Sequence, residues 1–295
     1  MPVTRRCAIK PRSAGYFYIM RLTSIAMTDQ EDQKSESPVP KISRYAFAMF
    51  DVLGFSRWVE TETLSVILAA YQQLIERAVL KPNEKGSLTA FHTPDGQLLA
   101  VTRAPAYAYF SDTILLWCPL APPLVADFIE RCSDLMCEAL AMDIPLRGAI
   151  TLGDAVLDND TNTYLGRPIV EANYLEKGQD WVGLTLANSA IWSPFLAQLH
   201  GASVIEYPAP MKERLKEWAS PVVVDWPRRW REKHASSPIN KLDELNKTPG
   251  FEKYWNNAKT FAEYSFSRHD WFMRPDQIPS DAILRLVPRS ETKFA

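Results

Sequence analysis

Apolar and polar positions alternate in two distinct rhythms beyond a polar N-terminal tail. Residues 44–53 (RYAFAMFDVL) form a nearly continuous apolar run, which is typical of a buried strand. Apolar residues then recur every three or four positions over 56–80, which predicts a helix that Ser56 can cap. Segments 87–104 and 106–120 follow as predicted strands of a hairpin-rich sheet, the first around a Pro-Asp-Gly turn.

The second half of the chain repeats this alternation. Prolines at the start and a regular stripe of leucine and phenylalanine predict a helix over 122–142. Residues 145–158 and 163–170 predict a strand pair around the turn 159–162, and 171–191 predicts the next helix. The remaining candidates are strands at 202–210 and 220–227 and polar helices within 238–269. This order of elements predicts an α+β sandwich, with helices packed on one sheet.

Length and composition set the size of the core. The chain has 295 residues, of which 46% are apolar and 23% charged, so it can bury one large core. We expect residues 1–42 to form a disordered tail, because they are polar, charged and punctuated by prolines. Residues 43–190 are predicted to form the core of the domain, and 191–295 to complete or extend it. Met27 is a second candidate for the start of the chain.

Charge and cysteine content narrow the partners. The net charge of -2 provides no basic field for a nucleic acid polymer, so a small, metal-neutralised anion is a better-suited ligand. No segment reaches the roughly 18 apolar residues of a membrane span, and we expect a cytoplasmic protein without membrane contact. The cysteines show neither paired zinc-site spacing nor the density of a secreted scaffold, which indicates reduced thiols. They are Cys7, Cys118, Cys132 and Cys137.

A carboxylate at the end of the first apolar strand is the strongest chemical signal. Asp51 follows an apolar run, and burying a carboxylate is costly unless a cation meets it. Asp112 stands in a second apolar strand, and the topology can set the two strands side by side. Neighbouring carboxylates repel each other, and a divalent cation relieves that repulsion. Gly54 permits a tight turn whose amides, from Leu53 to Ser56, can point at phosphates, so we expect a site for a metal-bound triphosphate.

Four motifs, in this order and spacing, resemble the class III nucleotidyl cyclase domain. They are FDVLGFS, FSDTILLW, PLRGAITLGDAV and YLGRPIVEANYLE, and the resemblance runs from about Tyr45 to Asn188. Within that family, the pattern GxPIVEAxxLE…QxWxG between Gly166 and Gly183 is most similar to the pyrimidine cyclases of the Pycsar antiphage systems. The resemblance implies a ferredoxin-like βαββαβ core and makes residues 43–190 the catalytic unit.

The same resemblance implies a reaction. Asp51 and Asp112 would bind two divalent ions, Mn²⁺ or Mg²⁺, with the backbone carbonyl of Val52 as a further ligand. The chain would be a lyase that converts UTP into 3′,5′-cyclic UMP and pyrophosphate, working as a head-to-tail homodimer with its sites at the interface. The diffusible product would activate a separate effector in antiviral defence. A cytidylate cyclase making cyclic CMP and an inactive cyclase-like nucleotide-binding protein are the alternatives.

Other enzyme classes with similar aspartates fit the sequence less well. A haloacid-dehalogenase-like phosphatase requires a second aspartate two residues after the first, and this chain has Leu53 there. A polymerase-palm-like or diguanylate-cyclase-like enzyme shares two metal carboxylates on a similar sheet. The glycine-rich acidic turn expected of a diguanylate cyclase is absent from this sequence.

An ungapped comparison with purine cyclases shows where the chain departs from their pattern. The lysine and aspartate that read a purine base in those enzymes fall on Ala108 and Thr163. The asparagine and arginine that orient the ribose and stabilise the transition state fall on Val170 and Tyr174. A pocket narrowed by aromatic side chains would exclude purines and accept a pyrimidine. The aromatic residues available for this narrowing are Tyr107, Tyr109 and Phe110.

Several residues are candidates for holding the nucleotide. Phe50 can pack against a base or ribose, or equally point into the core. Four polar residues are candidates by location and charge, although each is also typical of a solvated surface: Arg147, Arg167, Asn173 and Lys177. The predicted substrate-binding set is Phe50, Leu53, Gly54, Phe55, Ser56, Arg147 and Asn173.

Overall fold

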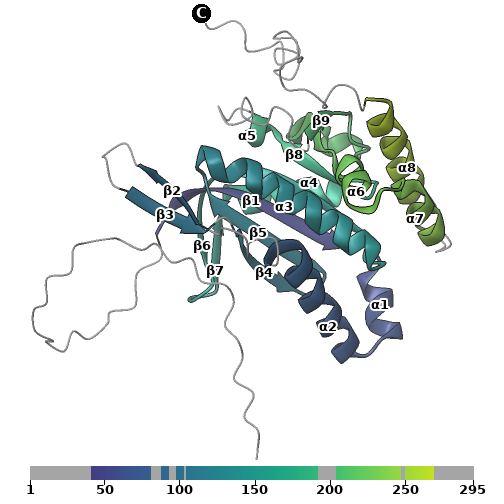
Figure 1. Cartoon of the computed structure of the whole chain (residues 1–295), viewed down its shortest axis with the longest axis horizontal. Helices are drawn as coiled ribbons and strands as arrows, with labels where there is room; N and C mark the ends of the chain where they lie inside the picture. The colour runs from purple at the N-terminus through teal and green to yellow at the C-terminus, as the bar shows by residue number, and fades with distance from the viewer. Residues whose placement is uncertain are drawn as a thin grey trace, which may run out of the picture.

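An eight-stranded sheet forms the centre of the molecule (Figure 1). The computed structural model describes residues 41–80, 88–92, 98–102, 104–191, 204–246 and 250–268. The strands are ordered β4-β5-β1-β6-β8-β10-β9, and β7 pairs with β6 outside this path. All pairs in this sheet are antiparallel except β6 with β8. The bounds are β1 Ser43–Val52, β4 Ala106–Phe110, β5 Thr113–Pro119, β6 Leu146–Asp158, β7 Thr163–Gly166, β8 Gly183–Ala187, β9 Val204–Glu206 and β10 Ala219–Val224.

Part of this sheet has the strand order of a ferredoxin-like fold. Along the chain, β1 is followed by helices, by the β4–β5 hairpin, by α3 (Pro122–Ala141) and by β6, which is a βαββαβ sequence. In space these strands lie in the order β6-β1-β5-β4, so that β1 is an inner strand. The predicted α+β class with a ferredoxin-like core is confirmed.

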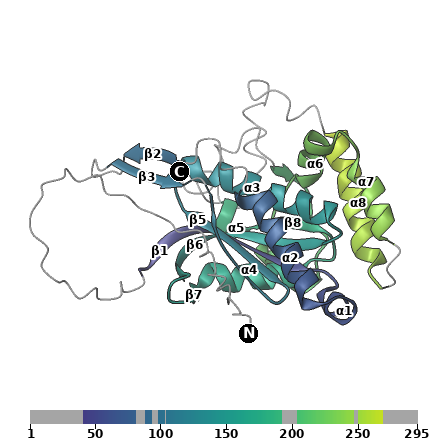
Figure 2. The same ribbon diagram turned by 60° about the horizontal axis from the view of Figure 1, so that its bottom comes forward.

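Helices cover both faces of the sheet (Figure 2). α2 (Leu64–Ile75) and α3 lie over one face, and the core between them and the sheet contains Phe50. α4 (Arg167–Gly178) lies over the other face, where Trp117 and Leu175 belong to a second core. Because successive side chains of a strand point to opposite faces, Asp51 leaves β1 on the side of α4.

The C-terminal region adds three helices next to the far strands of the sheet (Figure 1). α6 packs on α3, and α8 packs on α6 and α7. Trp226 and Trp230 of α6 are buried, so they are packing residues and not a platform for nucleic acid. No helix among the described residues combines the length and apolar character needed to cross a bilayer. The three bounds are α6 Trp226–His234, α7 Pro238–Leu245 and α8 Glu252–Ser267.

Two helix predictions are wrong in detail. The helix predicted over 171–191 ends at Gly178, and β8 then runs parallel to β6 before the short α5 (Asn188–Ile191). All five residues of β8 are buried, so the sequence lacks the alternation of apolar and polar residues that would indicate a strand. The helix predicted over 56–80 is divided into α1 (Phe55–Thr61), α2 and a π-helical turn (Glu76–Leu80). Gly54 takes the N-cap position of α1 in a left-handed conformation, so Ser56 is not the cap.

Other predictions are partly covered by the described residues. β2 (Leu88–His92) and β3 (Leu98–Thr102) form a separate two-stranded sheet, whereas the predicted Pro-Asp-Gly turn between them lies outside the described residues. The predicted tail lies outside them up to residue 40, and so does Cys7. The other three cysteines are buried and free, and burial raises the pKa of each thiol. The proposed division at residues 42 and 190 stays a prediction.

Candidate active site

The two predicted metal-binding aspartates come together at one end of β1. Asp51 is the penultimate residue of β1, and Asp112 lies in the two-residue turn between β4 and β5, not within a strand as predicted. The Val52 amide donates a hydrogen bond to the Asp112 carbonyl at 2.9 Å. Ser111 makes the turn possible with a φ of 53°, in the left-handed region. The carboxylates are close enough for the charge of Asp112 to raise the pKa of Asp51.

An aromatic cluster supports this turn from the α2 side. The Tyr71 hydroxyl donates to the Ser111 carbonyl at 2.9 Å. Its ring stacks on Trp58, with centroids 6.1 Å apart, and contacts Tyr109 at 5.3 Å. Phe55 meets the same ring edge-on at 6.4 Å. Burial and the two aspartates raise the pKa of Tyr71, so the phenol stays a neutral hydrogen-bond donor at physiological pH.

Arg147 is the cation beside Asp51. It stands on β6 directly opposite Asp51 in the ladder, and its Nε donates to Asp51 Oδ2 at 3.1 Å. Glu176 of α4 brings Oε1 to 2.8 Å from the same Nε. The single Nε hydrogen is directed to Asp51, so Glu176 Oε1 lies in ionic contact but lacks a hydrogen bond, although the side chain is only 4% exposed. Two carboxylates therefore share one guanidinium.

Burial makes this arrangement electrostatically costly. Loss of solvation raises the pKa of Asp51, with Arg147 opposing the rise and Asp112 adding to it. Loss of solvation and the charge of Asp51 raise the pKa of Glu176 to about 7, against the attraction of Arg147. The site carries more negative charge than its buried cation compensates. A further cation would be favourable there.

Gln179 fixes the position of Arg147 and explains the QxWxG pattern. The main-chain carbonyl of Gln179 accepts a hydrogen bond from Arg147 Nη1 at 3.1 Å. The buried side-chain amide of Gln179 donates to the Gly148 carbonyl at 2.6 Å. Its oxygen accepts from the Trp181 indole at 2.7 Å and from the Thr185 hydroxyl at 2.9 Å. A Cβ at Gly183 would lie 2.3 Å from the Trp181 ring, so only glycine fits. The pattern therefore holds a satisfied buried amide behind the arginine.

The C-terminal helix α8 reaches the same edge. The Tyr254 ring lies 6.0 Å from the Arg147 guanidinium carbon, which is a cation–π distance. Lys253 pairs with Asp180 at 2.6 Å, and Asn257 donates to the Asp180 carbonyl at 2.7 Å. α8 is thereby attached to the segment that carries Gln179. Sequence reasoning gave neither Tyr254 nor Gln179 a role at the site.

The donor set suits a divalent ion whose coordination is completed by a substrate. Within the described ranges, no group of three or more histidine, cysteine, aspartate or glutamate side chains is arranged as a self-contained metal site. Mg²⁺ is usually held by one or two carboxylates together with phosphate oxygens and water. Asp51 and Asp112 supply two such carboxylates, so they fit an ion that arrives with a triphosphate.

The remaining predicted substrate residues divide into several groups. Phe50 is fully buried on the α2 side, so it cannot contact a nucleotide. Leu53 and Phe55 also pack into that core. The Leu53 amide already donates to the Pro145 carbonyl at 2.9 Å, so of these two residues only Phe55 keeps a backbone amide that can meet a phosphate. Gly54 has a φ of 81°, which supports the expected tight turn, and Ser56 is exposed. Asn173 lies on α4 one turn before Glu176, and no hydrogen bond joins its side chain to the other described residues.

Arg167 and Lys177, the other two polar candidates, are exposed on α4. No ion pair or hydrogen bond joins either side chain to Asp51 or Asp112 in the described part of the chain. Both therefore remain candidates by location and charge alone.

The positions that read the base in purine cyclases lie on β4 and β7. Ala108 pairs with Leu115, and Thr163 pairs with Asp158 at the end of β6 opposite to Arg147. Asn159, in the turn before β7, donates to the Tyr107 carbonyl at 3.2 Å and so attaches the β6–β7 hairpin, which carries Thr163, to β4. The aromatic prediction is corrected here, because β4 alternates. Tyr107 and Tyr109 pack on the α2 side, whereas Ala108 packs on the opposite face with Tyr164. Phe110 is exposed at the end of β4.

Solved structures of nucleotidyl cyclases match the fold at low identity. The adenylyl cyclase CyaB of P. aeruginosa is 12% identical, with 54% of this chain and 83% of that chain covered and a TM-score of 0.37. A bacterial light-regulated adenylyl cyclase is 10% identical over 72% of this chain and 59% of its own, with a TM-score of 0.42. The catalytic core of a rhodopsin-guanylyl cyclase with converted specificity, in complex with ATPαS, is 12% identical over 61% and 93%, with a TM-score of 0.39.

Likeness at this level of identity and TM-score carries no argument about function. No family model and no curated protein sequence matches the chain. The side chains themselves carry the assignment of a function.

Proposed function

We propose that this protein is a uridylate cyclase, which converts UTP into 3′,5′-cyclic UMP and pyrophosphate at Asp51 and Asp112. The observation that carries the proposal is the pairing of these two aspartates at one end of β1, linked by the Val52 amide and the Asp112 carbonyl. Arg147 leaves part of the local negative charge uncompensated. A triphosphate that brings divalent ions supplies the missing positive charge.

The residues of this chain act mainly by positioning. Bound Mn²⁺ or Mg²⁺ would supply Lewis acidity toward the ribose 3′-hydroxyl and the α-phosphate. Asp51 and Asp112, with the Val52 carbonyl, would hold those ions. The amides of Gly54, Phe55 and Ser56 would be available to the phosphates, whereas the Leu53 amide already donates to the Pro145 carbonyl. Arg147, fixed by Gln179 and Glu176, keeps a guanidinium beside the developing negative charge. In-line attack on the α-phosphorus then expels pyrophosphate.

The choice of base rests on what lies near Ala108. Neither Ala108 nor Thr163 offers the charged side chain that reads a purine edge, and the Thr163 hydroxyl accepts from Thr161 at 2.9 Å. Tyr164 packs on the same side as Ala108 and meets Trp117 edge-on at 5.8 Å, so aromatic bulk is available there. This bulk favours the smaller pyrimidine ring. The motif resemblance supports uridine over cytidine.

A homodimer would complete the site. Val170 and Tyr174, which replace the asparagine and arginine of purine cyclases, are exposed on α4, and Tyr174 lies 5.7 Å from Trp218. A second copy placed head to tail would cover this apolar face and add part of the nucleotide pocket. The product would be a diffusible signal for a separate effector in antiviral defence. Mixing an Asp51→Asn chain with a Tyr174→Glu chain should then restore part of the activity that each loses alone.

Product identification tests the proposal. Purified protein is incubated with equimolar ATP, GTP, CTP and UTP and MnCl₂, and the cyclic products are quantified by mass spectrometry. We expect cyclic UMP to predominate. A dominant cyclic AMP or cyclic GMP peak would contradict the pyrimidine proposal, and cyclic CMP would contradict the choice of uridine alone. Absence of any product would favour the inactive nucleotide-binding alternative, which the apolar residues at 170 and 174 make the second candidate.

A further inference from the structure

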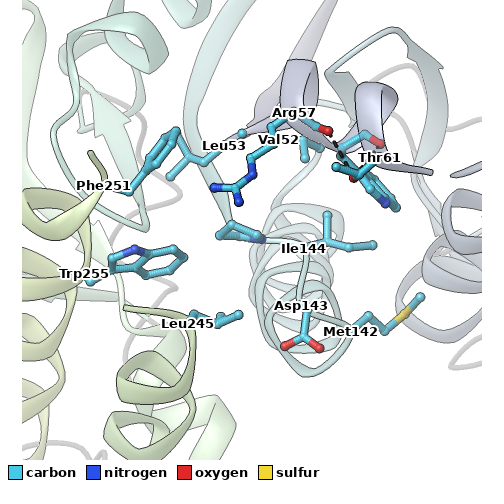
Figure 3. Close-up of a pocket in the computed structure, with 13 residues that line it drawn as sticks. Val52, Leu53, Arg57, Thr61, Met142, Asp143, Ile144, Leu245, Phe251 and Trp255 are labelled. Carbon is cyan, nitrogen blue, oxygen red and sulfur yellow. Dashed lines mark hydrogen bonds between the residues drawn. The ribbon is translucent and has the colours of Figure 1, made fainter. Parts of the chain in front are cut away.

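A cavity of 310 Å³ lies beside the turn that follows Asp51 (Figure 3). Its walls come from the turn itself, from α1, from the connection between α3 and β6, and from the ends of α7 and α8 that face each other. Asp51, Asp112 and Arg147 do not line it. The cavity therefore lies outside the two aspartates and Arg147 but shares Val52 and the turn at Gly54 with the proposed site. Its volume is that of a small-molecule site.

Most of the lining is apolar and aromatic. Flat apolar ligands pack well against such side chains, because ring faces give large contact area at low entropic cost. The apolar side chains of the wall include Trp58, Ile144, Leu245, Phe251 and Trp255.

Two hydrogen-bond donors of this wall have no protein partner. Figure 3 shows the Arg57 side chain extending between Leu53 and Ile144, and no ion pair or hydrogen bond is made by its guanidinium among the described residues. The Trp255 indole is buried, and its Nε1 has no acceptor in that same part of the chain. A buried donor without an acceptor is costly, so a small turn of the indole that brings Nε1 to a ligand oxygen would be favourable; the Arg57 guanidinium is exposed and can meet a ligand directly.

The acidic residue of the cavity is already neutralised. Asp143 lies away from Arg57 in Figure 3, and Lys241 approaches its carboxylate to 2.6 Å. The uncompensated charge in the wall is thus the single positive charge of Arg57. One cation with aromatic walls suits a monoanion with a ring, whereas a triphosphate would require more positive charge.

We propose that this cavity is a regulatory site for a small aromatic carboxylate. Its acidic group would pair with Arg57, an oxygen would accept from Trp255, and its ring would lie against Phe251. Phe251 also faces the turn, since a Cβ added at Gly54 would lie 3.9 Å from its ring. The Leu53 amide is held by the Pro145 carbonyl at 2.9 Å, so two cavity segments are joined through the backbone.

Occupancy would therefore act on the turn between Asp51 and α1. A ligand that contacts Leu53 and Phe251 together restricts the backbone that positions the Val52 carbonyl and the following amides. This regulatory part rests on the proposed cyclase activity, whereas binding itself does not. Calorimetry and turnover can consequently fail independently of each other.

The binding test uses 2-naphthoate as probe and 2-naphthamide as its uncharged match, titrated by calorimetry into the full-length protein. We expect 2-naphthoate to bind at one site per chain. The affinity for 2-naphthamide should be lower by about tenfold or more. Arg57→Gln should weaken 2-naphthoate by about tenfold, and Trp255→Phe, which keeps a ring, by about fivefold. Arg44→Gln is the matched control, because Arg44 forms an exposed pair with Asp154 and should leave affinity unchanged.

The same probe is then added to the wild-type turnover assay. A change of at least about twofold in kcat or KM for UTP, absent in Arg57→Gln, supports regulation. No binding by the wild-type protein, or binding that Arg57→Gln and Trp255→Phe leave intact, overturns the site. Binding that depends on Arg57 but does not alter turnover overturns the regulatory role. If no nucleotide is turned over at all, the calorimetric result still decides whether the site exists.

Discussion

Two clusters of buried charge in this molecule have opposite balances. Asp134 on α3 is 2% exposed, and cations surround it. Both of its oxygens accept hydrogen bonds, from Arg131, Arg229 and Lys233. At the end of β1 the ratio is reversed, because Asp51 and Glu176 share the single guanidinium of Arg147.

We use this difference in charge balance to distinguish a structural cluster from a candidate binding site. A carboxylate whose oxygens are all satisfied has little to offer a ligand, and its removal leaves buried cations without a partner. A site with excess negative charge is costly when empty and is stabilised by an added cation. We therefore interpret Asp134 as a connection between α3 and α6, and the Asp51–Arg147–Glu176 group as part of a binding site.

The largest expected effect is on catalysis. Asp51→Asn or Asp112→Asn should lower pyrophosphate release from UTP by about 10³-fold or more, because each removes a carboxylate that we propose as a metal ligand. Folding should be unaffected or slightly favoured, since the excess negative charge falls and Arg147 keeps Glu176. Turnover and denaturant unfolding measure the two effects. Asp154→Asn, at an exposed carboxylate, is the control; a folded Asp51→Asn protein with wild-type turnover would reject the assignment.

The opposite cluster should respond in stability. Asp134→Ala leaves Arg229 and its neighbours without a buried counter-ion, so the free energy of unfolding should fall by about 3–5 kcal/mol. Where the variant is still folded, its kcat should stay within about twofold of wild type. Urea unfolding checks this. A loss smaller than that of Asp51→Asn would erase the contrast between the two clusters.

The support behind Arg147 should show an intermediate effect. Gly183→Ala places a methyl group 2.3 Å from the Trp181 ring, so the indole must move away from Gln179. We expect a loss of about 1–3 kcal/mol in unfolding free energy, and lower turnover because Gln179 positions Arg147. Gly250→Ala is the control, since no atom lies within 4 Å of the added methyl group and strain from its φ of 91° is the main cost. Equal effects of the two substitutions would show that the Trp181 contact is unimportant.

The smallest expected effect concerns a third buried carboxylate. Asp225 caps α6 and accepts from Ser265 at 2.5 Å, yet its Oδ2 has no partner within the described residues. Burial raises its pKa, so the folded state holds the proton more tightly than the unfolded state. Its contribution to stability should therefore fall as pH rises through and above the usual carboxyl range.

Asp225→Asn should remove this pH dependence and leave turnover unchanged. The measurement is the free energy of unfolding of both proteins at several pH values from 4 to 7. We expect the slopes of the two pH profiles to differ by about 1 kcal/mol or less per pH unit. A loss of turnover in this variant would show that an unsatisfied buried carboxylate is functional wherever it occurs, and would weaken the argument from charge balance.

Sequence reasoning was sufficient to bring Asp51, Asp112 and Arg147 into one group of candidates, and the structure places them near one another; their roles stay predictions. An acidic residue at the end of an apolar run is informative, because burial makes it costly without a cation. The same reasoning did not single out Glu176, although this residue lies within the motif YLGRPIVEANYLE. Its contact with Arg147 depends on the packing of α4 against β6, which the sequence alone does not give. The QxWxG pattern was visible, but its reason required the three-dimensional packing: the Gln179 side chain accepts from the Trp181 indole, and its main-chain carbonyl accepts from Arg147.

Other features lay beyond what a one-dimensional pattern contains. β8 is buried on both faces and so lacks the alternation that marks a half-buried strand. The facing of Tyr107 and Tyr109 depends on where β4 begins, because a shift of one residue reverses every side chain. The Tyr254 contact and the 310 Å³ cavity depend on the packing of α8 against segments far away in the sequence.

The most direct test of the central claim is a count of bound Mn²⁺. Free Mn²⁺ is measured by electron paramagnetic resonance as wild-type, Asp51→Asn and Asp134→Asn proteins are titrated in the presence of a non-cyclisable UTP analogue lacking the 3′-hydroxyl. The excess negative charge at the end of β1 predicts that wild-type and Asp134→Asn proteins lower the free Mn²⁺ concentration further than the analogue alone does. The Asp51→Asn protein should not lower it further. Equal removal by Asp51→Asn and wild-type protein would contradict a metal site at Asp51.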